Sequence, residues 1–416
     1  MRVWFFFVLF VVTYFSSRGV LLAEFGFKGA IDFLILLLIR GVAFGYLIYS
    51  IFRWKLHRAI KKLVVVLLAI SLLSFLLNSG SLQQFYTFLL LVFYPIGFAL
   101  IIIEKVRYKD IYVVLIFTGV LALVQFAYSV ISNASLLFSQ VVVDDPFNGF
   151  FGYPRAYAFS YYSISVAAML FVCKDVLVKT TRYPMLLVGM VLCLTPVLAG
   201  AGRVVFLLVA SLPFLIFLEA TSIKRNLLLV LIFFVLAFGF QKYANVYDVT
   251  GDIFLELFLN PLANLKAYYF IESFLPFIVE PGNFILGLGP GNYMSSSAQQ
   301  FRLDLVAQFN DDLHLSYTTD AYQAFNNIIG FIGDAGLVFF LIYYYLAMRI
   351  YMPILSSLGS RERLVVKLFL VFTVLLSGFF HVFDDPYFSI SFWLAAGVFY
   401  RLSLEYDFSA KNGRAK

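Results

Sequence analysis

The stretch FNNIIGFIGDAGL, residues 325–337, joins a long polar segment to a strongly apolar one. Residues 241–325, which lead into it, carry many carboxylates, tyrosines and asparagines. A connector between two helices needs far fewer than these roughly 85 residues. We therefore expect any chemistry of this protein to lie where the polar segment meets its apolar neighbour.

The composition assigns most of the chain to a membrane. Of its 416 residues, 62% are hydrophobic and 13% are charged, which excludes a water-soluble domain. Runs of apolar residues long enough to span a bilayer predict an all-α polytopic membrane protein with about 12 transmembrane helices. We expect a single integral-membrane domain over residues 1–416, with residues 241–325 forming a large extracytoplasmic loop that contains short helices. The predicted helices cover residues 3–22, 29–52, 63–78, 82–103, 111–132, 159–173, 184–200, 203–220, 226–240, 326–350, 365–381 and 388–402.

The basic residues predict the orientation of the chain. Lys and Arg gather in every second connection, and the positive-inside rule places such connections in the cytoplasm. These basic connections include residues 53–62, 105–109, 174–182 and 361–367. Both termini are then cytoplasmic, and the polar segment lies outside. The net charge of +7 is spread over short loops, so it does not indicate a nucleic-acid partner.

Cations are rare on the predicted outward side, so each one is informative. Arg155 follows Tyr153-Pro154 ahead of an apolar run, and Arg203 ends the small-residue turn AGAGR. Lys266 and Arg302 lie within the polar segment. A guanidinium beside a glycine turn suits a phosphate, because its bidentate fork is supplemented by nearby backbone amides. One arginine alone fits a helix end anchored at the membrane interface better than a phosphate ligand, whereas several convergent cations on this side fit the two roles equally.

Three side chains are candidate bases: His314 and Asp320 in the polar segment, and Asp334 in the apolar run that follows. A histidine in a polar loop is usually only solvated. Asp334 needs a partner, because a charge inside a membrane is costly. Arg40, in the middle of an apolar run, is a candidate for that pairing, and a structural pair is as good a hypothesis as a catalytic one.

Other polar positions give weaker signals. His381 with Asp384 and Asp385 is either a second acid–base cluster or the polar cap of a short turn. Cys173 and Cys193 both fall in apolar segments, so we expect neither a disulfide nor a metal site. We also expect no cofactor.

The order of these landmarks resembles that of the bacterial O-antigen polymerase and O-antigen ligase superfamily. Asn326 followed by Asp334-Ala335-Gly336-Leu337 is similar to the His-Asn pair, acid, Gly and Leu that follow its large periplasmic loop. Tyr153-Pro154-Arg155-Ala156 is similar to its arginine-containing lead-in, and Ala199-Gly200-Ala201-Gly202-Arg203 to its Ser-Gly-Ser-Arg turn. Leu286-Gly287-Leu288-Gly289-Pro290-Gly291 is similar to its Gly-x-Gly string. The likeness covers residues 150–340, and the order and spacing of the motifs carry it.

The resemblance implies a metal-independent glycosyltransferase of the bacterial cytoplasmic (inner) membrane. Such an enzyme polymerises undecaprenyl-diphosphate-linked oligosaccharide repeat units into an O-antigen, capsule or exopolysaccharide. Donor and acceptor are then both lipid-linked, and a chain-length regulator is a further candidate partner. Arg155, Arg203, Lys266 and Arg302 are the expected diphosphate ligands, and the base is expected among Asp320, His314 and Asp334.

The sequence departs from the superfamily at two positions. Phe325 stands where ligases place a histidine, and Lys266 stands where an arginine often lies. The first departure argues against the alternative of a ligase that transfers polysaccharide to lipid A-core. Since phenylalanine cannot accept a proton, we rank Asp320 first as base, His314 second and Asp334 third. A flippase or exporter of lipid-linked sugars is the alternative from another class, although short loops and charges in several helices are typical of transporters.

Overall fold

The computed structural model describes residues 58–78, 82–132, 156–198, 202–219, 281–290, 327–377, 382–383 and 386–413, with isolated positions between Gly41 and Tyr49. These residues are almost entirely helical and contain no β-strand, which confirms the all-α prediction for this part of the chain. Within it, four stretches are long and apolar enough to cross a membrane: Arg58–Leu77, Tyr108–Ile131, Lys179–Val197 and Phe331–Ser357. The count of 12 helices and the large loop stay predictions, because the first and ninth predicted segments, most of the second and most of residues 241–325 lie outside the described residues.

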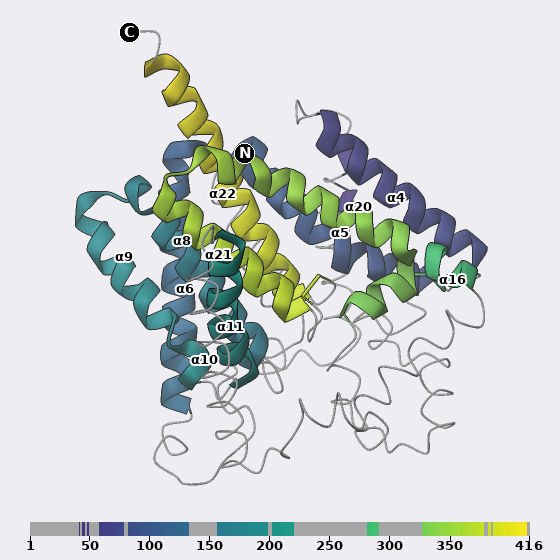
Figure 1. Cartoon of the computed structure of the whole chain (residues 1–416), viewed down its shortest axis with the longest axis horizontal. Coiled ribbons are helices and arrows are strands. Elements are labelled where there is room, and N and C mark those ends of the chain that lie inside the picture. The colour runs from purple at the N-terminus through teal and green to yellow at the C-terminus, as the bar shows by residue number, and fades with distance from the viewer. Residues whose placement is uncertain are drawn as a thin grey trace.

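Nine of the predicted apolar segments contain described helices (Figure 1). In the first half of the chain they are α4 (Arg58–Leu77), α5 (Leu82–Lys105), α6 (Ile111–Ser132), α8 (Ala156–Val172), α9 (Lys179–Leu192), α10 (Thr195–Leu198) and α11 (Gly202–Glu219). The second half contributes α16 (Pro281–Leu286), α20 (Asn327–Ser357), α21 (Ser360–Ser377) and α22 (Pro386–Gly413). Single 3-10 turns, η1 (Tyr108–Asp110) and η3 (Lys174–Val176), lie in two of the basic connections.

Two helices, α5 and α22, form the centre of the bundle. Every side chain described over residues 91–103 and 388–400 is buried, and α22 packs against α5, α8 and α20. A helix that is apolar on all sides belongs in the interior. At Gly397, a Cβ would lie 3.1 Å from Cα of Ala99 and from Cβ of Ile102. The missing side chain therefore lets α22 and α5 approach closely, as small residues commonly do between membrane helices.

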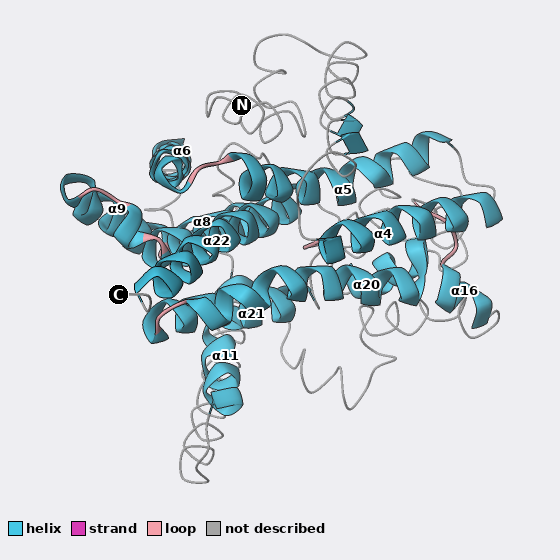
Figure 2. Ribbon diagram, turned by 90° about the horizontal axis from the view of Figure 1, so that it is seen from above, coloured by secondary structure: helices cyan, strands magenta, loops and turns pink. Residues whose placement is uncertain are grey.

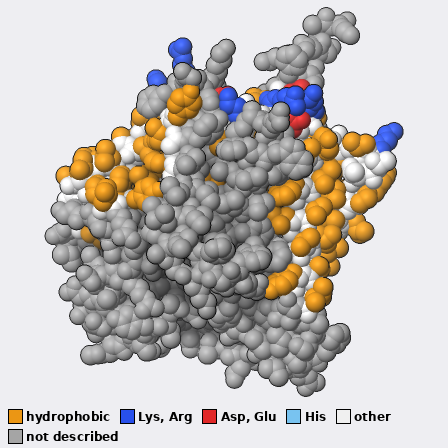
Figure 3. Space-filling view, turned by 180° about the vertical axis from the view of Figure 1, so that it is seen from behind, with side chains coloured by type: hydrophobic (Ala, Val, Ile, Leu, Met, Phe, Trp, Pro, Cys, Tyr) orange, Lys and Arg blue, Asp and Glu red, His pale blue; other side chains and the backbone are white. Residues whose placement is uncertain are grey.

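The remaining helices surround this centre in two groups. Figures 1 and 2 place α4, α16 and α20 on one side of α22, and α6, α8 and α9 on the other. Outer helices expose large apolar side chains, which on α4 include Leu72, Leu73, Leu76 and Leu77. In Figure 3 such side chains cover the flanks of the molecule, and Lys and Arg gather above them at one end. An apolar flank beneath a charged rim is the surface that a bilayer requires.

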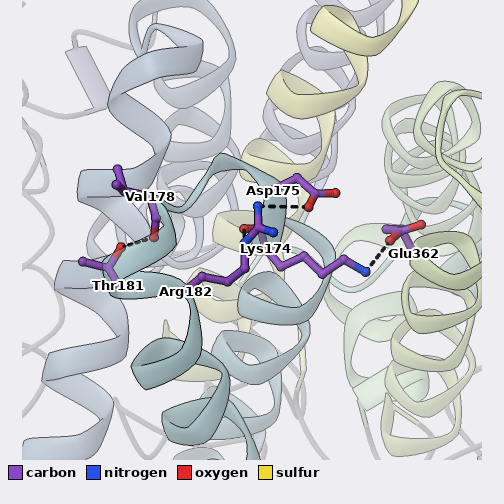
Figure 4. A network of polar contacts seen from close by, with 6 residues as sticks. All are labelled: Lys174, Asp175, Val178, Thr181, Arg182 and Glu362. Atoms are coloured by element: carbon purple, nitrogen blue, oxygen red, sulfur yellow. Dashed lines mark hydrogen bonds and ion pairs between the residues drawn. The ribbon is translucent and has the colours of Figure 1, made fainter.

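We call that charged rim the basic end, and it comprises residues 105–110, 174–182, 358–363 and Arg401. Its connections are tied together across the bundle. The Nζ atom of Lys174 lies 2.8 Å from Oε1 of Glu362 in another connection, and Arg182 pairs with Asp175 at 3.2 Å within the connection 174–182 (Figure 4). Arg401 donates from Nε to the carbonyl of Val106 at 2.8 Å. Connections that the sequence assigns to the cytoplasm thus lie at one end of the structure.

One predicted helix is divided in two. The sequence predicts a single span over residues 184–200, but α9 ends at Leu192 and α10 begins at Thr195 after a turn. Pro196 explains the division, because it has no N–H and its ring clashes with the carbonyl four residues before it in a continuous helix. That carbonyl belongs to Leu192, the last residue of α9.

Candidate functional site

The candidate site lies at a break in α20. Gly336 interrupts this helix with φ 86° and ψ 161°, a backbone conformation that L side chains do not readily adopt. The part after the break, residues 337–357, measures roughly 31 Å at 1.5 Å per residue, which is close to the thickness of the hydrocarbon core of a bilayer. Since Ser357 adjoins the basic end, the break lies about one membrane thickness away from it. We call this opposite side, with α16 and the starts of α8, α20 and α22, the far end.

The glycine string crosses the break backbone to backbone. Helix α16 and the turn after it pack on α20, and the N–H of Leu288 donates to the carbonyl of Gly333 at 2.6 Å. A Cβ on Gly287 would lie 2.6 Å from the carbonyl oxygen of Asp334 and 2.7 Å from the nitrogen of Gly336. A Cβ on Gly336 would in turn overlap the carbonyl of Ile285. Glycine at both positions is therefore what allows the two segments to touch.

Helix α4 supplies the third part of this joint. Ser74 donates from Oγ to the carbonyl of Asp334 at 3.4 Å. Asn78 donates from Nδ2 to the carbonyl of Ser74 at 2.8 Å and to that of Gly287 at 3.2 Å. Carbonyls at a break lose their helical partners and need others, above all inside a membrane. Leu288 and Ser74 serve the carbonyls of Gly333 and Asp334 in this way.

Neither Ser74 nor Asn78 is predicted as a site residue from the sequence. A signal was present, because the two polar side chains stand four residues apart at the end of an otherwise apolar run. That spacing places them on one face of a helix. Nothing in the sequence, however, indicated that the face would meet residues 287 and 334.

Asp334 lies at the centre of the joint with 0% of its surface exposed. Its neighbours in α20, Phe331 and Ala335, are buried as well. The ring of Phe331 stacks edge-on against Phe339 and Tyr343, so an aromatic cluster lies beneath the break. Asp334 has a further interaction besides the hydrogen bond that its carbonyl accepts from Ser74. A buried carboxyl group on a backbone held from two sides is well suited to orienting another polar group.

The other predicted site residues are placed less fully. Arg203 is the second residue of α11, but its side chain is not among those that the structure describes. Arg155 immediately precedes α8, which begins at Ala156 at the far end. Outside the described residues fall Arg155 itself, Lys266, Arg302, His314 and Asp320, as well as Arg40, Phe325, Asn326, His381, Asp384 and Asp385. The convergence of the four cations and the identity of the base stay predictions.

Within the described ranges, no three His, Cys, Asp or Glu side chains are grouped so as to hold a metal ion. No protein-family model matches this chain, and a search of curated proteins finds no match. The likeness to O-antigen polymerases therefore rests on the motifs themselves, two of which meet at the break in α20.

Proposed function

We propose that the protein is a polymerase of lipid-linked oligosaccharides, acting on the outer face of the bacterial cytoplasmic membrane with both termini in the cytoplasm. One observation carries the proposal. Two of the stretches on which the resemblance rests, 286–290 and 334–337, are far apart in the sequence and in contact at the break. Contact between them supports the view that they serve one site.

The position of the break suits a lipid-linked substrate. The polyprenyl tail of such a substrate stays in the hydrocarbon, while its diphosphate and sugars lie at the membrane surface. A site about one membrane thickness from the basic end has both regions within reach. The apolar flank of α4, with Leu72, Leu73, Leu76 and Leu77 exposed, adjoins the joint and offers a surface for the tail.

The proposed reaction is a glycosyl transfer without metal or cofactor. A hydroxyl oxygen of the acceptor sugar attacks the anomeric carbon of the donor. The new glycosidic bond forms as the bond from that carbon to the diphosphate oxygen breaks, and the polyprenyl diphosphate leaves with the electron pair. A side-chain base takes the hydroxyl proton. Cations stabilise the departing diphosphate, and we assign this role to Arg155, Arg203, Lys266 and Arg302.

We keep Asp320 as the first candidate base, with His314 second and Asp334 third. The complete burial of Asp334 fits its third place, because a base must come within hydrogen-bond distance of the acceptor hydroxyl. Asp334 instead suits the role of orienting the segment that leads into α20, which includes the position of Phe325.

The test is elongation by purified protein in lipid nanodiscs, supplied with lipid-linked repeat units, chelator and no energy source. We expect polymer from the wild type and none from Arg155→Ala, Arg203→Ala or Asp320→Asn at equal protein levels. Weaker losses are expected from His314→Ala and Asp334→Asn. Movement of labelled lipid-linked sugar across a bilayer, with no elongation, would replace the polymerase proposal by a flippase.

A further inference from the structure

Five neutral polar side chains are buried without a hydrogen-bond partner among the described residues. They are Gln125 on α6, Ser160 and Ser163 on α8, Thr195 on α10 and Ser389 on α22, and we call them the neutral polar cluster. None is more than 1% exposed, and both the nitrogen and the oxygen of the Gln125 amide are unsatisfied. Apart from Nε of Arg363 at the basic end, no other described side chain has such an atom.

The cluster gathers around the far-end half of α8. Helix α8 packs against α6, α10 and α22, the helices that carry the other members. The rings of Tyr161 and Phe388 lie 5.4 Å apart, which sets Ser389 at the level of Ser160. On α6, the side of Thr118 faces α8, because the hydroxyl of Tyr162 donates to the Thr118 carbonyl at 3.3 Å. Gln125 is two turns further from the basic end on that same buried side.

These groups are exceptions among the buried hydroxyls of the bundle. Thr118 donates to the carbonyl of Val114 at 2.8 Å, and Ser165 donates to that of Tyr161 at 2.7 Å. Such back-bonding to the preceding turn is the usual way for a helix to satisfy Ser or Thr. A buried polar group without a partner lowers the free energy of unfolding, whereas an apolar side chain of similar size does not. The cluster thus reduces stability at the end of the molecule where the candidate site lies.

The chemistry of the cluster selects its ligand. An amide offers donors and an acceptor, and each hydroxyl offers both, but no member carries a charge. The matching ligand is a neutral group that donates and accepts at several points, as a sugar does. We propose that the neutral polar cluster binds the hydroxyl groups of a sugar in the repeat unit when α8 separates from α6 and α10 at the far end. This inference rests on the proposed function.

The buried state of the cluster is compatible with such an opening. When the helices separate, the members of the neutral polar cluster gain hydrogen bonds that they lack while buried. The free energy of separation is therefore lower here than between two apolar helix faces. The diphosphate ligands proposed above are cations elsewhere in the chain. The neutral cluster therefore adds a sugar-recognition element, and it makes the acceptance of a repeat unit depend on its hydroxyl groups.

The first test variant is Gln125→Leu, and its matched control is Thr118→Val on the same side of α6. We expect Gln125→Leu to raise Tm by about 2 °C or more, because it removes an unsatisfied amide. The probe is the neutral repeat-unit oligosaccharide released from the cell's own polysaccharide, added at millimolar concentration in a thermal-shift assay. We expect it to stabilise the wild type and Thr118→Val, but not Gln125→Leu. Polymer yield from Gln125→Leu should fall roughly tenfold, the effect of one or two lost hydrogen bonds.

A second variant keeps the test decisive if Gln125→Leu does not fold. Ser160→Ala with Ser163→Ala removes two unsatisfied hydroxyls at little change in volume, and Ser165→Ala is its satisfied control on α8. Loss of oligosaccharide binding in the double variant alone supports the proposal. Unchanged binding and polymer yield in both test variants would overturn it and leave the cluster as a defect of packing. If the wild type bound the oligosaccharide but made no polymer, the sugar-binding role of the cluster would be supported and the polymerase proposal would be overturned.

Discussion

The two ends of the bundle are held together by different means. At the basic end, charged side chains from separate connections pair in the aqueous layer, as Lys174 does with Glu362. At the far end, backbone meets backbone at Gly287 and Gly336, and polar side chains lie buried without partners. Partly exposed ion pairs of this kind tolerate substitution because each contributes little to stability. A backbone crossing with no room for a Cβ does not tolerate substitution. Backbone conformations as unusual as that of Gly336 often accompany a functional site.

The largest effect should come from Gly336→Ala. Its φ of 86° alone costs an alanine about 1–3 kcal/mol, and the new methyl group would overlap the carbonyl of Ile285. We expect the joint between α16 and α20 to open, with a lower unfolding temperature in detergent and no polymer. Gly287→Ala, whose Cβ would lie 2.6 Å from the Asp334 carbonyl, should behave alike.

Gly282→Ala is the matched control for these two variants. Gly282 lies in α16, the short helix that directly precedes Gly287, and a Cβ there would meet nothing within 4 Å. We expect wild-type stability and polymer yield from it. If Gly336→Ala also kept both properties, the backbone crossing would not be what holds the far end together.

The next largest effect should come from Asn78→Ala. This change removes the hydrogen bond to the Gly287 carbonyl at 3.2 Å, which ties the end of α4 to the glycine string, and the bond to the Ser74 carbonyl at 2.8 Å. Net contributions of about 1 kcal/mol per bond predict a loss of about 2 kcal/mol in the free energy of unfolding. Polymer yield should fall with it, because α4 no longer positions the turn that contacts Asp334.

Ser71→Ala provides the control for Asn78→Ala. Ser71 is one turn before Ser74, and its hydroxyl donates only within α4, to the carbonyl of Leu67 at 2.9 Å. If Asn78 had a purely local role, Asn78→Ala and Ser71→Ala would have similar stability and similar polymer yield. A selective loss of polymer in Asn78→Ala assigns α4 a part in the far end.

The sequence was sufficient to predict most of the helices. Apolar runs of membrane length are decided locally, so α5, α6, α8 and α21 lie close to their predicted ranges. The basic connections also lie together at one end, as the distribution of charge predicts. Local residue types could equally have revealed the division between α9 and α10, since Pro196 marks it.

The arrangement of the candidate site could be predicted only in part. Leu286-Gly287-Leu288-Gly289 and Asp334-Ala335-Gly336 were both identified as motifs, but the pattern along α20 predicts an unbroken helix. The break becomes favourable only because Ser74 and Leu288 arrive from elsewhere to satisfy its carbonyls. Such long-range compensation leaves no local trace in the sequence, and neither do the unsatisfied groups around α8.

The smallest effect should come from Glu362→Gln at the basic end. Lys174 lies at hydrogen-bond distance from the Glu362 carboxylate and holds its pKa below the ordinary value of 4.5. The folded state therefore favours the ionised form, and the pair stabilises the protein at pH values above 4.5. This contribution is lost as the pH falls through the lowered pKa of the folded protein.

We expect Glu362→Gln to lose at most about 1 kcal/mol at neutral pH, as is usual for a partly exposed ion pair. The difference from the wild type should shrink in high salt and disappear in acid, while polymer yield stays unchanged. Thermal unfolding of the wild type, Glu362→Gln, Lys174→Met and the double variant measures the coupling directly. A loss of polymer in Glu362→Gln at equal protein level would contradict the contrast between the two ends, because it would give the basic end a part in the reaction.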